Sequence, residues 1–193
     1  MLATREPPFV GRRPLVRAAM QWAESRHAGD RRDVDHAPFI LHPLEVAALL
    51  SGRGYDEEVV GAALLHDVLE RTGAVVDEVH ARFGDRVAAI VAAVSEDGGI
   101  ADYRARKAAL RDQVARAGAD AQAVYAADKV AKTRELRAQA ARAGWSLADP
   151  ALSRRLEHYE ASLEMLERAG AAAPLVRQLA FELWALRHLP PAD

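Results

Sequence analysis

The spacing of hydrophobic positions along the chain predicts a protein made of helices. In the first such stretch, Leu15, Ala18 and Trp22 recur at intervals of three or four residues, which places them on one face of a helix. No segment shows the strict alternation of apolar and polar residues that is typical of a half-buried strand. The expected helices run from about 15 to 27, from 38 or 43 to 50, from 56 to 71, from 75 to 83, from 85 to 94, from 103 to 116, from 120 to 142, from 150 to 169 and from 174 to 189.

Turn-forming residues separate these helices and bound the domain. Asp56 is expected to cap the third helix, and Asp149 followed by Pro150 is expected to open the penultimate one. Residues 1–13 are rich in proline and glycine and are predicted to form a flexible N-terminal arm. Because no repeat and no change of composition divides the rest, residues 14–193 are predicted to form one all-α domain.

The composition supports the helical prediction and narrows the class of protein. Alanine, the strongest helix former, dominates the apolar half of the chain. The 26 basic and 28 acidic residues give a net charge of −2, so no basic excess indicates a nucleic-acid partner. No apolar run approaches the ~20 residues that span a bilayer, and the N-terminus lacks the apolar core of a signal peptide. We therefore expect a cytoplasmic protein without a membrane partner.

Two local features leave alternatives open. The basic stretch of Arg104, Arg106, Lys107 and Arg111 is best explained as a solvated helix face, although that helix could overhang a cleft. The last expected helix carries more large apolar residues than one face needs, so it could serve the core or a dimer contact, and an oligomer is possible. These apolar residues are Leu175, Leu179, Phe181, Leu183, Trp184 and Leu186.

Four polar residues in apolar helices indicate a metal site. His66 and Asp67 are adjacent in a helix that is otherwise apolar, and His42 and Asp128 lie in two other apolar helices. Burying a carboxylate is costly unless a cation or hydrogen-bond donors compensate it, and the chain has no cysteine to supply thiolate ligands. Two imidazoles and two carboxylates suit Mn²⁺ or Fe²⁺, and less distinctively Zn²⁺ or Mg²⁺.

Each of these residues also has a purely structural explanation. A histidine on an apolar face, such as His42, is more often a satisfied core residue than a ligand. Asp128 could cap a helix, or it could pair with Lys132 one turn later. The ordered combination of all four residues is what favours a metal centre over these alternatives.

The residues one turn after the His-Asp pair are candidates for catalysis. Glu70 follows His66 by four residues and Asp67 by three, so a continuous helix would place its carboxylate on the same face. There it could orient or deprotonate a water molecule at the metal. Arg71 follows Asp67 by four residues and could pair with that carboxylate or reach toward a phosphate. The structural alternative for both is an exposed charge at a helix end.

Four sequence segments together resemble a known enzyme family. They contain a His-Pro pair after an aromatic residue, a Leu-Leu-His-Asp helix followed by glutamate, a Phe-Gly joint before a valine-rich helix, and an Ala-Asp-Lys motif. A Gly144-Trp145-Ser146 turn fits the same pattern. Over roughly residues 15–170 the chain resembles the hydrolase domain of the RelA/SpoT family, and in particular its small stand-alone alarmone hydrolases. The segments are PFILHPLEVA (38–47), AALLHDVLER (62–71), FGDRVAAIV (83–91) and YAADKVAKTREL (125–136).

The resemblance implies a fold, a cofactor and a reaction. The fold would be the helical bundle of HD-domain phosphohydrolases, with one Mn²⁺ held by His42, His66, Asp67 and Asp128. Members of the family remove the 3′-pyrophosphate from guanosine tetra- or pentaphosphate, and the metazoan type also removes the 2′-phosphate of NADPH. The chain would then be a metal-dependent (p)ppGpp 3′-pyrophosphohydrolase.

The resemblance also implies two substrate-binding positions. Arg32 falls where the family has a basic residue near the substrate, and Tyr159 falls near a substrate-facing tyrosine. The structural alternatives are a solvated loop charge for Arg32 and a core aromatic for Tyr159.

Three positions depart from the family pattern. The second acid after the His-Asp pair is replaced by Arg71, a lysine of the loop is replaced by Asp33, and an asparagine that contacts the sugar is replaced by Lys132. We hypothesise that Arg71 and Lys132 enlarge a phosphate-binding pocket and change the preference among phosphorylated nucleotides.

Several functions remain open at this point. The substrate could be a guanosine alarmone, its adenosine counterpart, NADPH or another phosphorylated nucleotide. Because Arg71 replaces an expected acid, the chain could also be a degenerate module that binds a nucleotide with little turnover. A purely structural helical protein with a vestigial site is the least favoured alternative, since all four candidate ligands are present.

Overall fold

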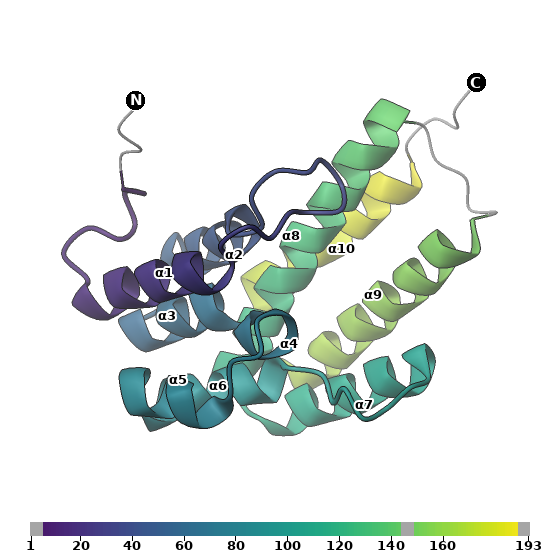
Figure 1. Ribbon diagram of the computed structural model, residues 1–193. Coiled ribbons are helices and arrows are strands. Elements are labelled where there is room, and N and C mark those ends of the chain that lie inside the picture. The colour runs from purple at the N-terminus through teal and green to yellow at the C-terminus, as the bar shows by residue number, and fades with distance from the viewer. Residues whose placement is uncertain (1–5, 144–148, 189–193) are drawn as a thin grey trace.

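The structure is a computed structural model that describes residues 6–143 and 149–188, and these ranges are folded into helices and connecting loops (Figure 1). Within them the sole extended pairing is an isolated bridge between Arg31 and Pro38. The all-α prediction is therefore confirmed. The helices are α1 (Pro14–Arg26), α2 (Leu41–Ser51), α3 (Glu57–Leu65), α4 (Val68–Arg71), α5 (Val76–Phe83), α6 (Asp85–Val94), α7 (Tyr103–Arg116), α8 (Ala119–Ala143), α9 (Pro150–Ala169) and α10 (Ala173–Arg187).

Helix α8 runs through the middle of the molecule and organises the other helices. It packs against α2, α3, α6, α7, α9 and α10, and in Figure 1 α1 to α3 lie on one side of it and α9 on the other. Residues 121–131 of α8 are all buried, polar ones included. A helix that is buried around its whole circumference has neighbours on every side, so its polar side chains must be satisfied within the protein.

The capping residues predicted from the sequence are confirmed. Asp56 accepts a hydrogen bond from the backbone N–H of Val59 at 3.0 Å and thereby starts α3. Asp149 accepts one from the N–H of Ala151 at 2.8 Å, and Pro150 occupies the first position of α9. These caps fix where the two helices begin.

The helix expected over residues 56–71 is interrupted at its functional end. Helix α3 ends at Leu65, Asp67 has φ −98° and ψ 0°, and α4 is a single turn. The imidazole Nδ1 of His66 donates to the carbonyl of Ala63 at 2.8 Å, which satisfies one of the carbonyls left free at the end of α3. The His-Asp pair therefore lies in a bend between two helices and not within one continuous helix.

Part of the expected N-terminal arm is packed onto the domain. Of residues 1–13, the structure describes residues 6–13, where Val10 is fully buried in the hydrophobic core. Glu6 also pairs with Arg17 of α1, with its Oε1 2.7 Å from the guanidinium Nε. Burial of Val10 explains why this segment follows the surface of the domain.

The large apolar residues of the last helix divide into two groups. Four leucines of this helix are buried, and α10 packs on α8 and α9. They are Leu175, Leu179, Leu183 and Leu186. In contrast, Phe181 is 58% exposed and Trp184 is 57% exposed, with their rings stacked at 6.1 Å. The leucines belong to the core, and the two aromatic side chains lie on the surface.

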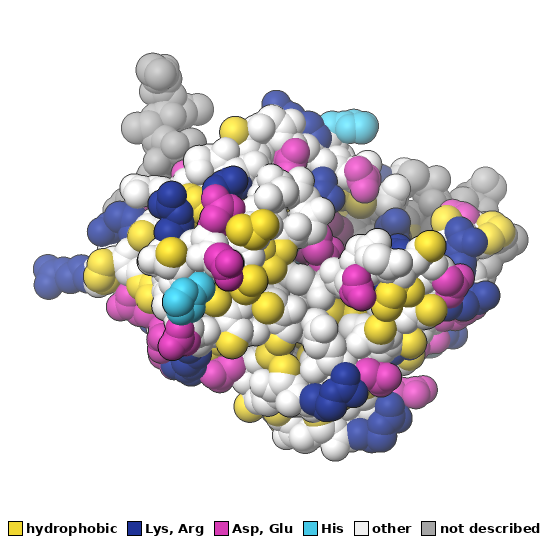
Figure 2. Space-filling view, turned by 60° about the horizontal axis from the view of Figure 1, so that its bottom comes forward, with side chains coloured by type: hydrophobic (Ala, Val, Ile, Leu, Met, Phe, Trp, Pro, Cys, Tyr) yellow, Lys and Arg dark blue, Asp and Glu magenta, His cyan; other side chains and the backbone are white. Residues whose placement is uncertain are grey.

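The molecular surface carries charges of both signs. On the face shown in Figure 2, basic and acidic side chains are intermingled, and neither sign forms a large continuous area. None of the helices in the described ranges is both long and apolar enough to cross a membrane.

Candidate metal centre

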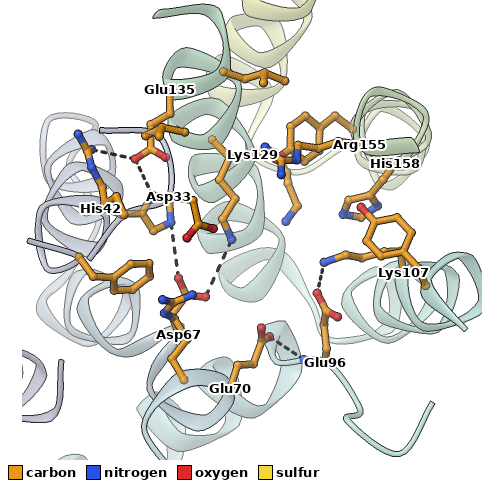
Figure 3. Close-up of a pocket in the computed structure, with 18 of the residues that line it drawn as sticks. Asp33, His42, Asp67, Glu70, Glu96, Lys107, Lys129, Glu135, Arg155 and His158 are labelled. Atoms are coloured by element: carbon orange, nitrogen blue, oxygen red, sulfur yellow. Dashed lines mark hydrogen bonds and ion pairs between the residues drawn. The ribbon is translucent and has the colours of Figure 1, made fainter. Parts of the chain in front are cut away.

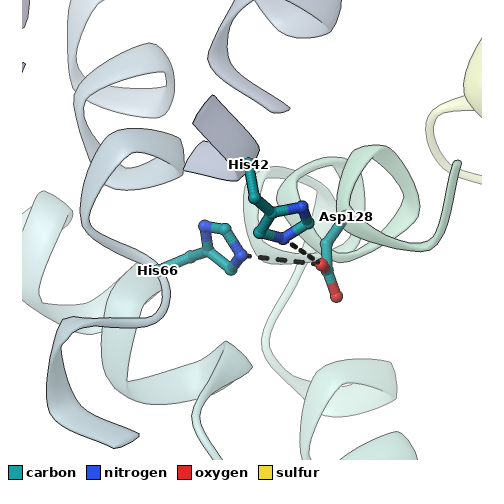
Figure 4. A group of neighbouring side chains, drawn as sticks. All are labelled: His42, His66 and Asp128. Carbon is teal, nitrogen blue, oxygen red and sulfur yellow. Dashed lines mark hydrogen bonds and ion pairs between the residues drawn. The ribbon is translucent and has the colours of Figure 1, made fainter. Parts of the chain in front are cut away.

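Three of the four predicted metal ligands, His42, His66 and Asp128, form a buried group whose ligand atoms lie within 4.8 Å of one another, and Asp67 lies beside both imidazoles. His42 comes from the first turn of α2, His66 and Asp67 from the bend between α3 and α4, and Asp128 from the buried part of α8. The Nε2 atom of His42 lies 3.0 Å from Asp128 Oδ1, and the Nε2 atom of His66 lies 3.5 Å from the same oxygen (Figure 4). Asp67 Oδ2 is 3.2 Å from His66 Nε2 and 3.7 Å from His42 Nε2. All four residues are buried, and each is at most 5% exposed as a whole residue.

The hydrogen bonds of His66 show that this set of atoms suits a cation. Its Nδ1–H donates to Ala63 O at 2.8 Å, so in the neutral imidazole Nε2 carries a lone pair. That buried Nε2 has no hydrogen-bond partner among the described residues, yet it faces the carboxylates of Asp67 and Asp128. A lone pair opposed to two carboxylates is unfavourable unless a positive charge lies between them. Two nitrogens and two carboxylates therefore fit a divalent metal ion.

The electrostatics of the cluster agree with this interpretation. Burial lowers the pKa of His66, but the negative charges of the Asp67 and Asp128 carboxylates that face its ring outweigh burial and raise that pKa to about 10. Burial raises the pKa of Asp67, but the neighbouring imidazoles and Lys132 bring it well below the usual range. The two aspartates are thus held as anions, and a proton or a metal ion can compensate their charge.

Two lysines of α8 contact Asp128. Lys132 Nζ lies 3.0 Å from Asp128 Oδ1 and 4.0 Å from Asp67 Oδ1, so the ion pair considered as an alternative role for Asp128 is present as well. Lys129, which the site prediction did not include, is buried, with its Nζ 2.7 Å from Asp128 Oδ2. Its position directly after the aspartate in the Ala-Asp-Lys motif is the signal that could have identified it.

A pocket of about 290 Å³ opens onto the metal centre (Figure 3). His42 and Asp67 lie at one side of it in this view, and Lys107, Arg155 and His158 lie at the other. The pocket brings together all five residues predicted to act in catalysis or substrate binding. These are Glu70, Arg71, Arg32, Lys132 and Tyr159.

Glu70 and Arg71 both line the pocket, although the broken helix changes how they reach it. Glu70 Oε1 accepts a hydrogen bond from the backbone N–H of Glu96 at 2.8 Å. Burial raises the pKa of Glu70, and the nearby charge of Asp67 raises it further. The guanidinium of Arg71 lies 3.9 Å from the ring centre of Phe39. Glu70 is thus a carboxylate with increased proton affinity that lies close to the candidate metal centre.

Of the two contacts considered for Arg71, the structure does not show the ion pair with Asp67. Among the described residues its ion-pair partner is Asp30, with Arg71 Nε 3.9 Å from Asp30 Oδ2, and not Asp67. Arg71 stacks on Phe39 in the loop before α2 and lines the pocket there.

The two remaining candidates are Arg32 and Tyr159, and both are held by contacts within the protein. Arg32 donates to Glu135 Oε1 at 2.9 Å and also pairs with Asp35, so it is not a freely solvated loop charge. Tyr159 is a buried aromatic residue of α9, as the structural alternative expected, and it also lines the pocket. Asp33 lies on the pocket wall as well.

Other charged pocket residues were not predicted from the sequence. Arg31, Glu135 and Arg155 line the cavity, and so does Lys107, whose ammonium pairs with Glu96. For Lys107 the alternative that its basic helix overhangs a cleft is the one observed. Glu135 and Arg155 lie on helices rich in other charges, so the sequence offers no signal that separates them from a solvated face. The Gly144-Trp145-Ser146 turn lies outside the described residues.

An all-helical domain that gathers two histidines and two aspartates from three segments beneath a charged pocket has the features of a metal-dependent hydrolase. The chain belongs to the HD domain family, whose family model matches residues 19–152.

Sequence relatives define the resemblance more closely. Guanosine-3′,5′-bis(diphosphate) 3′-pyrophosphohydrolase MESH1 of Xenopus tropicalis is 35% identical over 135 residues, which cover 68% of this chain and 74% of the relative. The human protein of the same name is 34% identical over 131 residues, which cover 66% of this chain and 72% of the relative. A guanosine-3′,5′-bis(diphosphate) 3′-pyrophosphohydrolase of Aquifex aeolicus is 40% identical over 93 residues, 48% of this chain, but the match spans only 13% of that longer protein.

Solved structures confirm the predicted fold. A metazoan orthologue of SpoT that hydrolyses ppGpp superposes with a TM-score of 0.76 at 27% identity, over 92% of this chain and 97% of the other. The protein lmo0812 of Listeria monocytogenes superposes with a TM-score of 0.65 at 28% identity, over 76% of this chain and 99% of the other. The resemblance to the RelA/SpoT hydrolases is thereby confirmed.

Proposed function

We propose that this protein is a metal-dependent phosphohydrolase that removes the 3′-pyrophosphate from guanosine tetra- and pentaphosphate. The observation that carries the proposal is the cluster of His42, His66, Asp67 and Asp128 beside a pocket that His42 and Asp67 line and that has basic residues on both sides. The relatives named above, which carry this activity in their names, support the choice of substrate.

The charges of the pocket suit a nucleotide with phosphate groups at two positions. Arg32, Arg71 and Lys132 line the pocket, as do Lys107 and Arg155, which Figure 3 shows on the side opposite His42. Because arginine and lysine form strong charge-assisted hydrogen bonds with phosphate oxygens, one phosphate group can be held near the candidate metal ligands while another is held at the far side.

The four ligands would hold one divalent ion, for which we propose Mn²⁺. When bound, such an ion lowers the pKa of a coordinated water and polarises a phosphoryl oxygen. Glu70 would accept the proton of the attacking water, since it is the pocket carboxylate one turn beyond Asp67 and has a raised pKa. Tyr159 would pack against the nucleotide from α9.

Lys132 and Arg71 would decide which nucleotide is preferred. Lys132 Nζ lies within 3.0 Å of Asp128, so it would contact a phosphate next to the metal ligands. Arg71 stacks on Phe39 and would meet a phosphate or a base along the wall. Each charge-assisted contact contributes roughly 1.5–3 kcal/mol, which is enough to reorder related substrates.

A substrate panel tests the proposed reaction. The full chain with Mn²⁺ is assayed with guanosine tetra- and pentaphosphate, the adenosine counterpart and NADPH, and released pyrophosphate is measured separately from released phosphate. We expect pyrophosphate from the guanosine alarmones and at least a 100-fold loss in His66→Ala. Tight alarmone binding without turnover would indicate the degenerate module, and phosphate from NADPH alone would indicate a 2′-phosphatase.

The same panel tests the roles of Arg71 and Lys132. Arg71→Asp and Lys132→Asn are expected to change the order of kcat/KM among the substrates. Arg104→Ala is the matched control, because Arg104 is a basic residue that pairs with Glu157 at the surface and does not line the pocket. An unchanged substrate order in both variants would contradict the hypothesis that these cations set the preference.

A further inference from the structure

One ring nitrogen of His42 has no hydrogen-bond partner in the described ranges 6–143 and 149–188. His42 Nε2 faces the centre, 3.0 Å from Asp128 Oδ1. The opposite ring nitrogen, Nδ1, is buried and has no hydrogen-bond partner among the described residues. The carboxylate that faces Nδ1 belongs to Glu135, whose Oε1 lies 3.5 Å away.

Glu135 occupies a place between two functional groups. It follows Asp128 by seven residues on α8, so two turns of helix place both carboxylates on the same side. Its Oε1 also accepts a hydrogen bond from Arg32 Nη1 at 2.9 Å (Figure 3). A single carboxylate oxygen thus faces both the imidazole of His42 and the guanidinium of the loop that precedes α2.

The usual hydrogen bonding of metal-bound histidines explains why a carboxylate lies next to His42 Nδ1. A neutral imidazole that offers the lone pair of Nε2 to a metal carries its proton on Nδ1. A buried N–H without an acceptor is costly, and metal-bound histidines usually donate that hydrogen to a carboxylate or carbonyl, which fixes the orientation of the ring. His66 follows this pattern through the carbonyl of Ala63. For His42 the corresponding acceptor is Glu135, once the separation shortens by a few tenths of an ångström.

We propose that Glu135 is the positioning residue of His42, and that it connects the metal centre to Arg32 at the substrate pocket. This inference rests on the proposed metal centre. A competing explanation is that Glu135 serves Arg32 alone. Arg32 is also held by Asp35, so the two explanations can be separated by removing Arg32.

The test is the affinity of the full-length, chelator-treated protein for Mn²⁺, measured by calorimetry without substrate. Glu135→Ala is expected to weaken binding by about 10- to 100-fold, because Nδ1–H of His42 loses its acceptor. Glu135→Gln should recover most of the affinity, since its amide oxygen still accepts that hydrogen. Glu45→Ala is the matched control: Glu45 lies on α2 three residues after His42, and its ion-pair partner is Arg134.

A double-variant comparison separates the two explanations. If Glu135 acts through His42, Arg32→Ala has little effect on Mn²⁺ affinity, and adding Glu135→Ala in that background produces the full loss. If Arg32→Ala alone reproduces the loss and the second substitution adds nothing, the proposal is overturned. It is also overturned if Glu135→Ala binds Mn²⁺ as tightly as the unaltered protein.

Two further measurements cover the cases in which the protein binds no metal or the Glu135→Ala variant does not fold. If the unaltered protein binds no Mn²⁺, or His66→Ala binds it equally well, the proposed metal centre itself fails and this inference fails with it. If Glu135→Ala does not fold, as judged by circular dichroism, nuclear magnetic resonance of ¹⁵N-histidine in the unaltered Zn²⁺-loaded protein decides. We expect His42 to carry its proton on Nδ1, with a resonance that shifts in Glu135→Gln; a proton on Nε2 would overturn the proposal.

Discussion

At the scale of single residues, Asp128 Oδ1 is the atom on which the candidate centre converges. His42 Nε2 and Lys132 Nζ each lie 3.0 Å from it, and His66 Nε2 lies 3.5 Å from it. A lysine ammonium so close to a ligand oxygen competes with any other cation for that oxygen. Metal binding would therefore displace the Lys132 ammonium toward the pocket, where a phosphate would meet it.

Glu70 provides the residue-scale prediction. We expect Glu70→Gln to lower kcat by about 10²- to 10⁴-fold, because the side chain can no longer accept a proton, while Mn²⁺ affinity stays nearly unchanged. Burial and the charge of Asp67 raise the pKa of Glu70, so the basic form is lost as the pH falls through that raised value.

The measurement for Glu70 is a profile of kcat/KM against pH. In the unaltered protein the acid limb should lie above the ordinary glutamate pKa of about 4.3. In Glu70→Gln this limb should be absent from the residual activity. Retention of both the limb and the rate would exclude Glu70 as the proton acceptor.

At the scale of helices, a buried carboxylate holds α10 on α8. Glu182 of α10 is buried, with its Oε1 2.7 Å from Arg134 Nε and its Oε2 3.0 Å from Arg137 Nη2. Both arginines belong to α8, and Arg134 precedes Glu135. These charge-assisted bonds therefore connect α10 to the helix that carries Asp128.

Removing this carboxylate should destabilise the protein measurably. We predict that Glu182→Ala lowers the free energy of unfolding by about 2 kcal/mol, the value of charge-assisted hydrogen bonds in a buried setting. Urea denaturation followed by circular dichroism measures it. The control is Glu164→Ala, which removes an exposed carboxylate 3.9 Å from Arg168 and should leave stability unchanged. Equal stability of both variants would contradict the role given to Glu182.

The helices were predictable where hydrophobic spacing and capping chemistry are local signals. Asp56 and Asp149 were recognised as caps because an N-cap acts on backbone groups within three residues. The bend after Leu65 was not predictable, because the apolar pattern continues through it and neither glycine nor proline marks it. The hydrogen bond found at the bend, from His66 Nδ1 to the carbonyl of Ala63, is not encoded in the spacing of apolar residues.

The residues of the candidate site also differ in whether a local sequence signal identifies them. The four ligands stood out because polar residues such as His66 are rare in apolar helices. Glu135 and Arg155 did not stand out, because charged residues on a charged helix resemble a solvated face. Their place in the pocket follows from how α8 and α9 pack, and helix packing is not a property of either helix alone.

At the scale of the whole molecule, metal binding should stabilise the fold. A ligand that binds only the folded state at 100 times its Kd adds about 2.7 kcal/mol. For a domain of this size each kcal/mol raises Tm by roughly 2–4 °C, so saturating Mn²⁺ should raise it by about 5–10 °C. Thermal unfolding with Mn²⁺ and with excess chelator measures the shift. His66→Ala is the control and should show none; an equal shift in that variant would place the ion elsewhere.

The separation of the candidate ligands along the chain has a consequence for how the protein unfolds. His42 and Asp128 are 86 residues apart in sequence, and the chain contains no cysteine. An ion shared by these two side chains would close a loop of that length, as a disulfide does in a secreted protein, but in a form that a chelator can undo. The protein would then carry a reversible cross-link through its centre, and depletion of the metal would shorten its lifetime as a folded molecule as well as stop its chemistry.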